Sequence, residues 1–251
     1  METPRHRLCV ILVAPRNPLN IGAAARAMSN FGVDCLRLVT PYEVAFREAR
    51  SAVGASHVLG AAVEYQSLGD AVADCALVVG TTSAGHRELG HPLHRLEHAA
   101  PLVRAALAVG PVALLFGSEK YGLSNEDLTY CHWLLRIPAR DEHGSMNLGQ
   151  AVAVCLYELI RDPEAWPLHA ASKKPASAGD LERITDLALQ ILEGSGYMNP
   201  KTRLSTARKV RRLVYRLSLS ARDAELLLGM LRQVRWRQGT PPGDQHAGRE
   251  H

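Results

Sequence analysis

The sequence predicts an α/β fold built on a mainly parallel sheet with helices on both faces. Two apolar runs end abruptly in polar loops, Val112 to Phe116 before a glycine-bearing loop and Trp133 to Ile137 before Pro138. Uninterrupted apolar runs of this length are typical of buried parallel strands. Strand-like and helix-like segments also alternate along the chain, which favours the same architecture. Because open α/β sheets bind ligands at the carboxyl ends of their strands, these loops are the first candidates for a functional site.

The elements can be taken in order. The run from Leu8 to Ala14 predicts the first strand, and Asn20 is expected to cap a helix from Ile21 to Phe31 that ends at Gly32. Residues 41–69 are weakly patterned but helical in character. The other elements expected in this part are strands at Cys35 to Val39, Cys75 to Gly80, Val112 to Phe116 and Trp133 to Ile137, and helices at Leu93 to Val109 and Leu148 to Leu159.

The composition shifts after the last of these helices. A segment rich in Pro, Ala, Ser and Lys predicts a linker, and three further helices predict a small helical extension. Asp180 is expected to cap the first of these helices and Ser220 the third. The predicted organisation is an α/β domain at 1–161, a linker at 162–179, a basic helical extension at 180–238 and a disordered tail at 239–251.

Charge is divided unevenly over the 251 residues. Residues 1–165 hold 14 Lys and Arg against 17 Asp and Glu, whereas residues 166–251 hold 15 against 8. Such asymmetry indicates an acidic partner for the second part, and nucleic acid is the partner that we expect. A basic amphipathic helix could also bind a membrane surface or a partner protein.

The cysteines indicate a reducing compartment. They are odd in number, far apart and mostly embedded in apolar runs: Cys9, Cys35, Cys75, Cys131 and Cys155. We therefore expect reduced core thiols in a cytoplasmic protein rather than a disulfide framework or a zinc site. The run from Leu8 to Ala14 is too short to span a membrane and lacks a cleavage pattern, so no membrane association is expected.

Three other short motifs are absent or lack a residue that their function requires. Gly117 and Gly122 have the spacing of a P-loop, but Leu123 stands where the phosphate-binding lysine is required. The dinucleotide fingerprint GxGxxG does not occur. His94 to His98 fits the HxxEH pattern of a zinc protease, but no feature designates a third ligand, so we expect no metal.

Three ordered motifs resemble those of the SPOUT class of RNA ribose 2′-O-methyltransferases. They are Asn17 to Met28 after the first strand, Phe116 to Leu123, and Ile137-Pro138 followed by Ser145 to Leu148. Within this class the chain is most similar to the bacterial tRNA (cytidine/uridine) 2′-O-methyltransferases, because a basic helical extension follows the domain at 1–161. The sequence departs from the common pattern at Leu19, where glycine is frequent, and at Met146, where leucine is frequent.

The resemblance implies a knotted catalytic domain, S-adenosylmethionine as methyl donor, and a homodimer with a shared active site. It also implies a tRNA substrate methylated at nucleotide 32, a cytidine or uridine of the anticodon loop. The candidate catalytic residues are Arg26, Ser145 and Asn147. The candidate cofactor-binding residues are Thr81, Thr82, Ser83, Ala84, Gly117, Glu119, Gly122, Ile137, Gly144, Ser145, Met146 and Leu148.

An arginine is a poor base because its pKa is so high, so we expect Arg26 to bind a phosphate or to stabilise the developing alkoxide. Ser145 and Asn147 are also typical helix caps, and the two roles are compatible. The candidate RNA-binding residues are Asn17, Asn20, Arg26, Lys201, Arg203, Arg208, Lys209, Arg211, Arg212 and Arg216. The alternatives are a ribosomal RNA 2′-O-methyltransferase of the same fold and an RNA-binding protein without catalysis.

Overall fold

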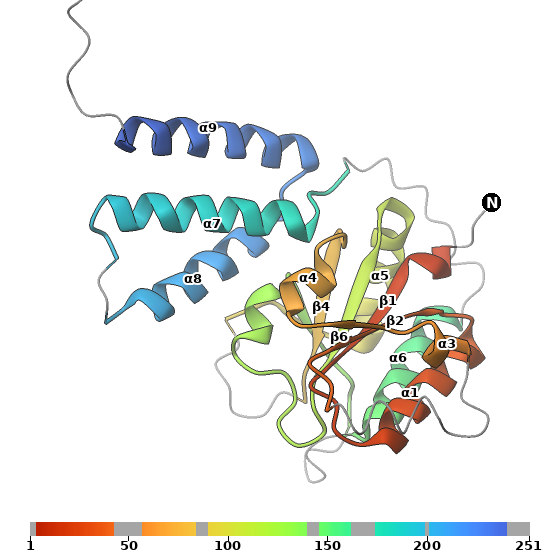
Figure 1. The fold of residues 1–251 in the computed structure, drawn as a ribbon. Coiled ribbons are helices and arrows are strands. Elements are labelled where there is room, and N and C mark those ends of the chain that lie inside the picture. Colours follow the sequence, from red (N-terminus) through yellow and green to blue (C-terminus); the bar gives the residue numbers. More distant parts are fainter. Residues whose placement is uncertain are drawn as a thin grey trace, which may run out of the picture.

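The computed structural model describes residues 4–42, 57–83, 90–139, 146–161, 174–198 and 201–239. The described strands form one sheet in the order β3-β2-β1-β6-β4-β7-β5, and every neighbouring pair is parallel (Figure 1). The strands are β1 (Leu8–Val13), β2 (Cys35–Val39), β3 (Val63–Tyr65), β4 (Leu77–Thr81), β5 (Leu93–Arg95), β6 (Val112–Phe116) and β7 (Trp133–Arg136). The predicted parallel sheet is therefore confirmed.

Helices cover both faces of the sheet, as predicted. In β1, Leu8 and Val10 belong to one core and Cys9 and Ile11 to the other, because successive side chains of a strand point to opposite faces. The first face is covered by α1 (Pro18–Phe31), α3 (His57–Gly60), α5 (Leu96–Val109) and α6 (Leu148–Ile160). The second face is covered by α4 (Leu68–Val72), α7 (Ala178–Gly194), α8 (Arg203–Arg216) and α9 (Ala221–Gly239). Two short 3₁₀ helices are η1 (Pro4–Arg7) and η2 (Asp127–Tyr130).

The loops that carry the predicted site leave one edge of the sheet. β1, β6, β4 and β7 are consecutive in the sheet, and parallel strands end at the same edge. The chain segments after Val13, Thr81, Phe116 and Arg136 therefore emerge side by side. This arrangement brings together motifs that are far apart in the sequence.

Two predicted helix caps were wrong. The side chain of Asn17, not Asn20, caps α1 by accepting from Leu19 N at 2.9 Å, and Pro18 takes the first helical position, where an N–H is not needed. Ser177, not Asp180, caps α7. Ser177 Oγ accepts from Asp180 N at 3.1 Å, while the Asp180 carboxylate accepts from Ser177 N at 3.2 Å, which forms a capping box.

Two edge strands were missed. Leu93 to Arg95 was predicted as the start of a helix but forms β5, which pairs with β7, and α5 begins only at Leu96. The segment Val63–Tyr65, within the stretch predicted as helical, forms β3 beside β2. Both strands have three residues and half-exposed side chains, so neither has the apolar run that marks the central strands.

The helical extension packs directly on the second face of the sheet (Figure 1). At the start of α7, Ala178 N donates to Cys75 O and Gly179 N donates to Ala73 O, both at 2.8 Å. Tyr215 of α8 is fully buried and places its ring edge against His132 and Tyr130. As predicted, Ser220 Oγ accepts from Asp223 N at the start of α9, at 3.2 Å. The extension thus shares a core with the sheet.

Some predictions fall on residues outside the described part of the chain. Residues 140–145, between β7 and α6, lie outside it, so the knot stays a prediction. The same holds for most of the predicted linker, 162–173, and for the tail beyond 239. Of the described helices, none is long and apolar enough to cross a membrane.

Candidate active site

Glu119 ties the loop after β6 to the loop after β1. Its carboxylate accepts hydrogen bonds from Arg16 N at 3.2 Å, Asn17 N at 3.1 Å and Asn20 Nδ2 at 3.0 Å. Burial by itself would raise the pKa of Glu119, but the hydrogen bonds from Asn20 and the backbone outweigh it and hold the pKa below its ordinary value. Glu119 is therefore a carboxylate at neutral pH, and its two oxygens orient the start of α1.

Asn20 also makes a hydrogen bond to the third motif. Because its amide nitrogen donates to Glu119, its Oδ1 is left to accept, and it accepts from Asn147 Nδ2 at 2.8 Å. Asn147 Oδ1 in turn accepts from Gly149 N at 3.0 Å and Gln150 N at 3.3 Å, which caps α6. The chain Glu119–Asn20–Asn147 thus joins all three motifs, and the structural role expected for Asn147 is confirmed.

The glycines keep the loop after β6 tight. A methyl group on Gly117 would lie 2.0 Å from the carbonyl carbon of Gly122, so no larger residue fits there. Gly122 has φ +66°, a left-handed conformation that favours glycine, and its N–H donates to Ser118 O at 2.8 Å. The loop therefore folds back on itself at the edge of the sheet.

The remaining predicted cofactor residues that are described lie at the end of β4, after β7 and at the start of α6. Thr81 Oγ1 donates to Leu115 O at 2.8 Å, and Thr82 N donates to Leu135 O at 2.9 Å. Ile137 is half-buried, Leu148 is buried, and Ser83 and Met146 are exposed. Ala84, Gly144 and Ser145 lie outside the described residues.

Arg26 is exposed on α1 and, among the described residues, has no hydrogen-bond or ion-pair partner. It shares a helix face with Leu19, since seven residues make nearly two turns, and that leucine is 79% exposed. On the neighbouring helix α6, Val154 and Tyr157 are 37% and 57% exposed. Each of the two packed helices therefore carries exposed apolar side chains, and α1 carries Arg26 as well. No contact in the described chain brings Arg26 to the Glu119–Asn20–Asn147 chain.

Part of the predicted RNA-binding set is engaged within the molecule. Arg211 pairs with Glu126 at 3.0 Å and Glu182 at 3.1 Å, and its guanidinium lies 4.5 Å from the centre of the Tyr130 ring. Arg208 also pairs with Glu126, at 2.6 Å. We call these five residues the docking cluster, because they join α8 to η2 and α7. Sequence reasoning missed Glu126, Tyr130 and Glu182 here, and no motif marks them.

Burial has the largest effect on the pKa of Glu182. It raises the pKa of the Glu182 carboxyl above its ordinary value, and the attraction of Arg211 offsets only part of this. The Arg211 side chain is 16% exposed. A residue placed in this way holds the extension on the sheet and has little surface left for RNA.

The other basic residues of the extension differ in their surroundings. Lys201 and Lys209 are exposed, whereas Arg203 pairs with Glu193 at 2.6 Å. Arg216 donates to Gly90 O at 3.2 Å, and Arg212 is half-buried beside the same glycine.

The HxxEH pattern does not form a metal site. His94 lies on β5 with its ring edge-on to Trp133 at 5.1 Å, whereas His98 lies on α5, so the pattern does not occupy one helix. Within the described residues, no group of three or more His, Cys, Asp or Glu is placed to hold a metal ion.

The parallel sheet, with three motif loops joined at its carboxyl edge, defines the class of the SPOUT RNA methyltransferases. Residues 7–157 match the SpoU rRNA Methylase family, and the chain belongs to this family; it is an RNA methyltransferase, as predicted.

Relatives and solved structures agree with this assignment over nearly the whole chain. The tRNA (cytidine/uridine-2′-O-)-methyltransferase TrmJ of Sodalis glossinidius is 35% identical, over 97% of this chain and 98% of that protein. TrmJ of Pectobacterium atrosepticum is 38% identical over 90% and 95%. The crystal structure of TrmJ from Z. mobilis ZM4 is 33% identical with a TM-score of 0.78, over 90% of this chain and 98% of that one. The predicted resemblance to these enzymes is confirmed, and so is the fold.

Proposed function

We propose that the protein transfers a methyl group from S-adenosylmethionine to a ribose 2′-hydroxyl in tRNA, at a cytidine or uridine in position 32 of the anticodon loop. The observation that carries this proposal is the junction of the three motif loops through Glu119, Asn20 and Asn147. The similarity to TrmJ proteins along almost the full chain supports tRNA as the substrate.

The residues at the edge of the sheet fit the proposed donor. Open space beside Gly122 would let a donor approach the backbone of the tight loop, and Ile137 and Leu148 offer an apolar wall for an adenine. Thr81 and Thr82 are held in place by hydrogen bonds to neighbouring strands. When bound, S-adenosylmethionine would supply an electrophilic methyl group, and the protein would then need to position the hydroxyl and stabilise its developing charge.

Arg26 is the residue that we assign to this charge. A guanidinium is a cation and a poor base, so Arg26 would stabilise an alkoxide and lower the pKa of the hydroxyl rather than accept the proton. We further propose a homodimer with a shared active site, formed through the exposed face of α1 and α6. A second copy placed there would cover Leu19, Val154 and Tyr157, and Arg26 would reach the donor site of the other subunit.

In the extension, we assign RNA contacts to the residues with accessible charge, above all Lys201 and Lys209. Phosphate contacts of this kind give affinity without reading sequence. A cytoplasmic location is part of this proposal, because tRNA is the expected substrate.

The test is methyl transfer from labelled S-adenosylmethionine to unmodified total tRNA and, in parallel, to ribosomal RNA, followed by mapping of the modified nucleoside. We expect label on the ribose of nucleotide 32 in tRNA. Label on ribosomal RNA alone would favour the first alternative, a ribosomal RNA 2′-O-methyltransferase. Donor and RNA binding without any transfer to either RNA would favour the non-catalytic protein.

A further inference from the structure

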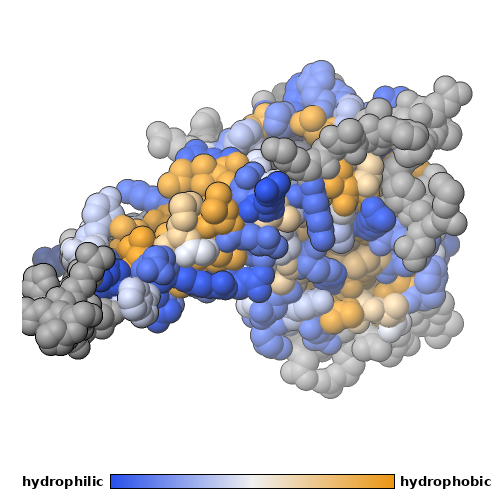
Figure 2. All heavy atoms as spheres, turned by 90° about the horizontal axis from the view of Figure 1, so that it is seen from above, coloured by the Kyte–Doolittle hydropathy of each residue, from blue (hydrophilic) through white to orange (hydrophobic). Residues whose placement is uncertain are grey.

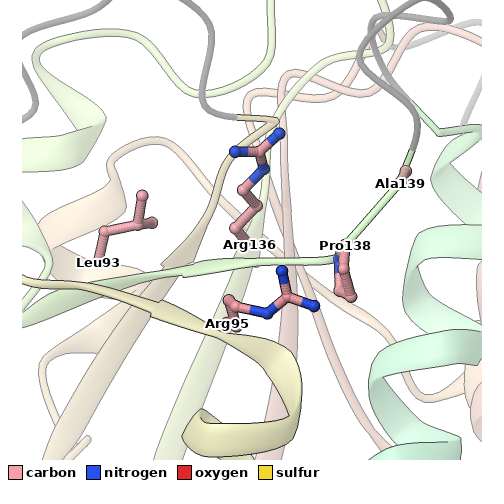
Figure 3. A pocket seen from close by; sticks show the side chains of 5 residues that line it. All are labelled: Leu93, Arg95, Arg136, Pro138 and Ala139. Carbon is pink, nitrogen blue, oxygen red and sulfur yellow. The ribbon is translucent and has the colours of Figure 1, made fainter.

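The cavity shown in Figure 3 lies at the carboxyl ends of β5 and β7 and has a volume of about 390 Å³. It is lined by Leu93, Arg95, Arg136, Pro138 and Ala139. Its two arginines are partners in the parallel ladder, but their guanidinium groups point in different directions, so they do not form one binding site. A tighter cluster, of two thiols and a guanidinium, lies near the opposite edge of the sheet.

Cys9 and Cys35 bring their thiols into contact near the amino ends of two neighbouring strands. Cys9 is the second residue of β1 and Cys35 the first of β2, and the two are partners in the parallel ladder. Both side chains pack in the core on the second face of the sheet. Their Sγ atoms lie 2.7 Å apart, and both cysteines are free thiols. Sulfur atoms placed in this way on adjacent strands can be joined with little movement of the backbone.

A guanidinium lies on the same face of β2, two residues after Cys35. The Arg37 side chain is 14% exposed and is fixed by two contacts with the Asp74 carboxylate, at 2.6 Å and 2.8 Å. The hydrogen bond with Cys9 lowers the pKa of Cys35 to about 7, and the charge of Arg37 acts in the same direction, against the effect of burial. The same hydrogen bond and burial raise the pKa of Cys9. Near neutral pH, Cys35 is therefore the thiolate and Cys9 keeps its proton.

The thiols of this region also differ in their access to solvent. Cys9 is 2% exposed, whereas Cys35 is only half-buried. A third thiol, Cys75, has its Sγ 4.0 Å from Arg37 Nη1, but it is fully buried, and burial is the main cause that raises its pKa to about 12. An accessible thiolate beside a protonated thiol is the arrangement in which one cysteine attacks an oxidant and the other resolves the product.

We infer that Cys9 and Cys35 form a peroxide-reactive pair, in which Cys35 is oxidised first and Cys9 then closes a disulfide between β1 and β2. In the first step the Cys35 thiolate attacks one oxygen of hydrogen peroxide, the O–O bond breaks, and the leaving hydroxide takes up a proton to form water. In the second step the Cys9 sulfur attacks the sulfenic sulfur of Cys35, and the hydroxyl group leaves as water with the Cys9 proton. The thiols lose two electrons in total, and the peroxide is reduced to two molecules of water.

This site is separate from the methyl transfer proposed above. The motif loops leave the carboxyl edge of the sheet, whereas the thiol pair lies near the amino ends of β1 and β2. The pair also packs on the second face, and the proposed dimer surface on α1 and α6 lies on the first. Oxidation of the pair can therefore be measured whichever RNA the protein methylates.

The experiment treats the full-length reduced protein with hydrogen peroxide at neutral pH, blocks the remaining thiols with N-ethylmaleimide and maps the peptides by mass spectrometry. At a dose that leaves Cys75, Cys131 and Cys155 unmodified, we expect two of the five thiols to be lost, a peptide that links Cys9 to Cys35, and recovery of all five with dithiothreitol. Without peroxide, iodoacetamide should label Cys35 roughly tenfold faster or more than those three buried cysteines. Equal labelling rates, or a disulfide between other cysteines, would overturn the inference.

Single variants test the two assigned roles. In Cys9→Ala, Cys35 should stop at the sulfenic acid, which dimedone traps, whereas Cys35→Ser should form neither the disulfide nor a dimedone adduct. The matched control is Cys75→Ala, which removes the third thiol beside Arg37 and should still form the disulfide. A dimedone adduct on Cys9 in Cys35→Ser, or loss of the disulfide in a folded Cys75→Ala, would overturn the inference. If a variant folds poorly, early trapping with dimedone in the wild type makes the same test, and an adduct on Cys9 rather than on Cys35 would contradict the assignment.

Discussion

Carboxylates organise two regions of this molecule in opposite ways. At the carboxyl edge of the sheet, Glu119 accepts only from uncharged donors, namely two backbone N–H groups and the amide of Asn20. In the docking cluster, Glu126 and Glu182 face the guanidinium of Arg211. The docking cluster uses the positive charge of Arg211 to hold α8 in place, whereas Glu119 contacts no charged side chain among those that the structure describes. An arginine in a basic helix is therefore not by itself evidence of an RNA contact.

The helical extension and the central strands also differ in how much apolar surface they expose. Figure 2 shows apolar side chains gathered on the helical extension, and Leu226, Met230 and Val234 of α9 are 64%, 51% and 46% exposed. These residues recur every four positions and form one stripe on the helix. The central strands, in contrast, expose almost none of their apolar side chains.

The largest expected effect concerns Arg26, to which we assign the stabilisation of the developing charge. Arg26→Ala should reduce turnover on tRNA by roughly a hundredfold or more, because loss of one group that stabilises a developing oxyanion has effects of that size. Affinity for S-adenosylmethionine should be unchanged. Single-turnover methyl transfer and equilibrium donor binding measure the two quantities, and Arg7→Ala is the control. Wild-type turnover in the Arg26 variant would remove this residue from catalysis.

The next prediction concerns a variant that disrupts the hydrogen bonds between the motif loops. Glu119→Gln replaces one accepting oxygen with a donor, which then faces either Arg16 N, or Asn17 N together with Asn20 Nδ2. We expect a loss of about 1–3 kcal/mol in the free energy of unfolding and weaker donor binding, since donors are left without acceptors. Urea unfolding and donor titration provide the measurements. Glu64→Gln on the edge strand β3 is the control, and equal behaviour of the two variants would argue against the junction.

Glu119 also makes a prediction for pH. The pKa of Glu119 is lower in the folded protein than its ordinary value. Its contribution to the free energy of unfolding is therefore complete above the ordinary pKa of a glutamate and is lost as the pH falls through the folded pKa. Unfolding of the Glu119→Gln variant should therefore depend less on pH in the acidic range than unfolding of the wild type.

These predictions depend on features that the sequence revealed to different degrees. The central strands and the three motifs were predictable because buried parallel strands need apolar runs and the loops need glycine at defined points, as at Gly117. The caps of α1 and α7 were misplaced by three residues each, because several residues near a helix start are chemically able to cap it. Local patterns select the helix but not its first residue.

The docking cluster could not be predicted at all. Glu126 and Arg211 are 85 residues apart in the sequence, and no spacing rule connects them. The same holds for the pairing of Arg95 with Arg136, because β5 was taken for the start of a helix. Contacts that depend on which elements become neighbours emerge only from the assembled fold.

A fourth prediction concerns the contact of the extension with the sheet. His132 is buried, accepts from Val78 N at 3.1 Å through Nδ1, and has a pKa lowered to about 4, with burial as the main cause. The His132 imidazole binds a proton more tightly in the unfolded chain than in the folded protein. The free energy of unfolding therefore falls as the pH decreases from about 6.5 toward 4. The expected loss is on the order of 3 kcal/mol. His132→Gln keeps an acceptor for Val78 and should flatten this part of the pH profile, whereas an unchanged profile would locate the acid sensitivity elsewhere.

The smallest expected effects distinguish the role of Arg211 from that of Lys209, which lies on the same helix, α8. Arg211→Ala leaves Glu182 buried without its partner, so the free energy of unfolding should fall by about 1–3 kcal/mol, and Glu182→Gln in the same chain should restore part of it. Lys209→Ala removes an exposed charge and should change stability by less than about 0.5 kcal/mol. Its effect should fall on tRNA binding, with a salt slope that is shallower by about one phosphate contact. If Arg211→Ala changed the salt slope and Lys209→Ala changed the stability, the division of α8 into docking and RNA-binding residues would be wrong.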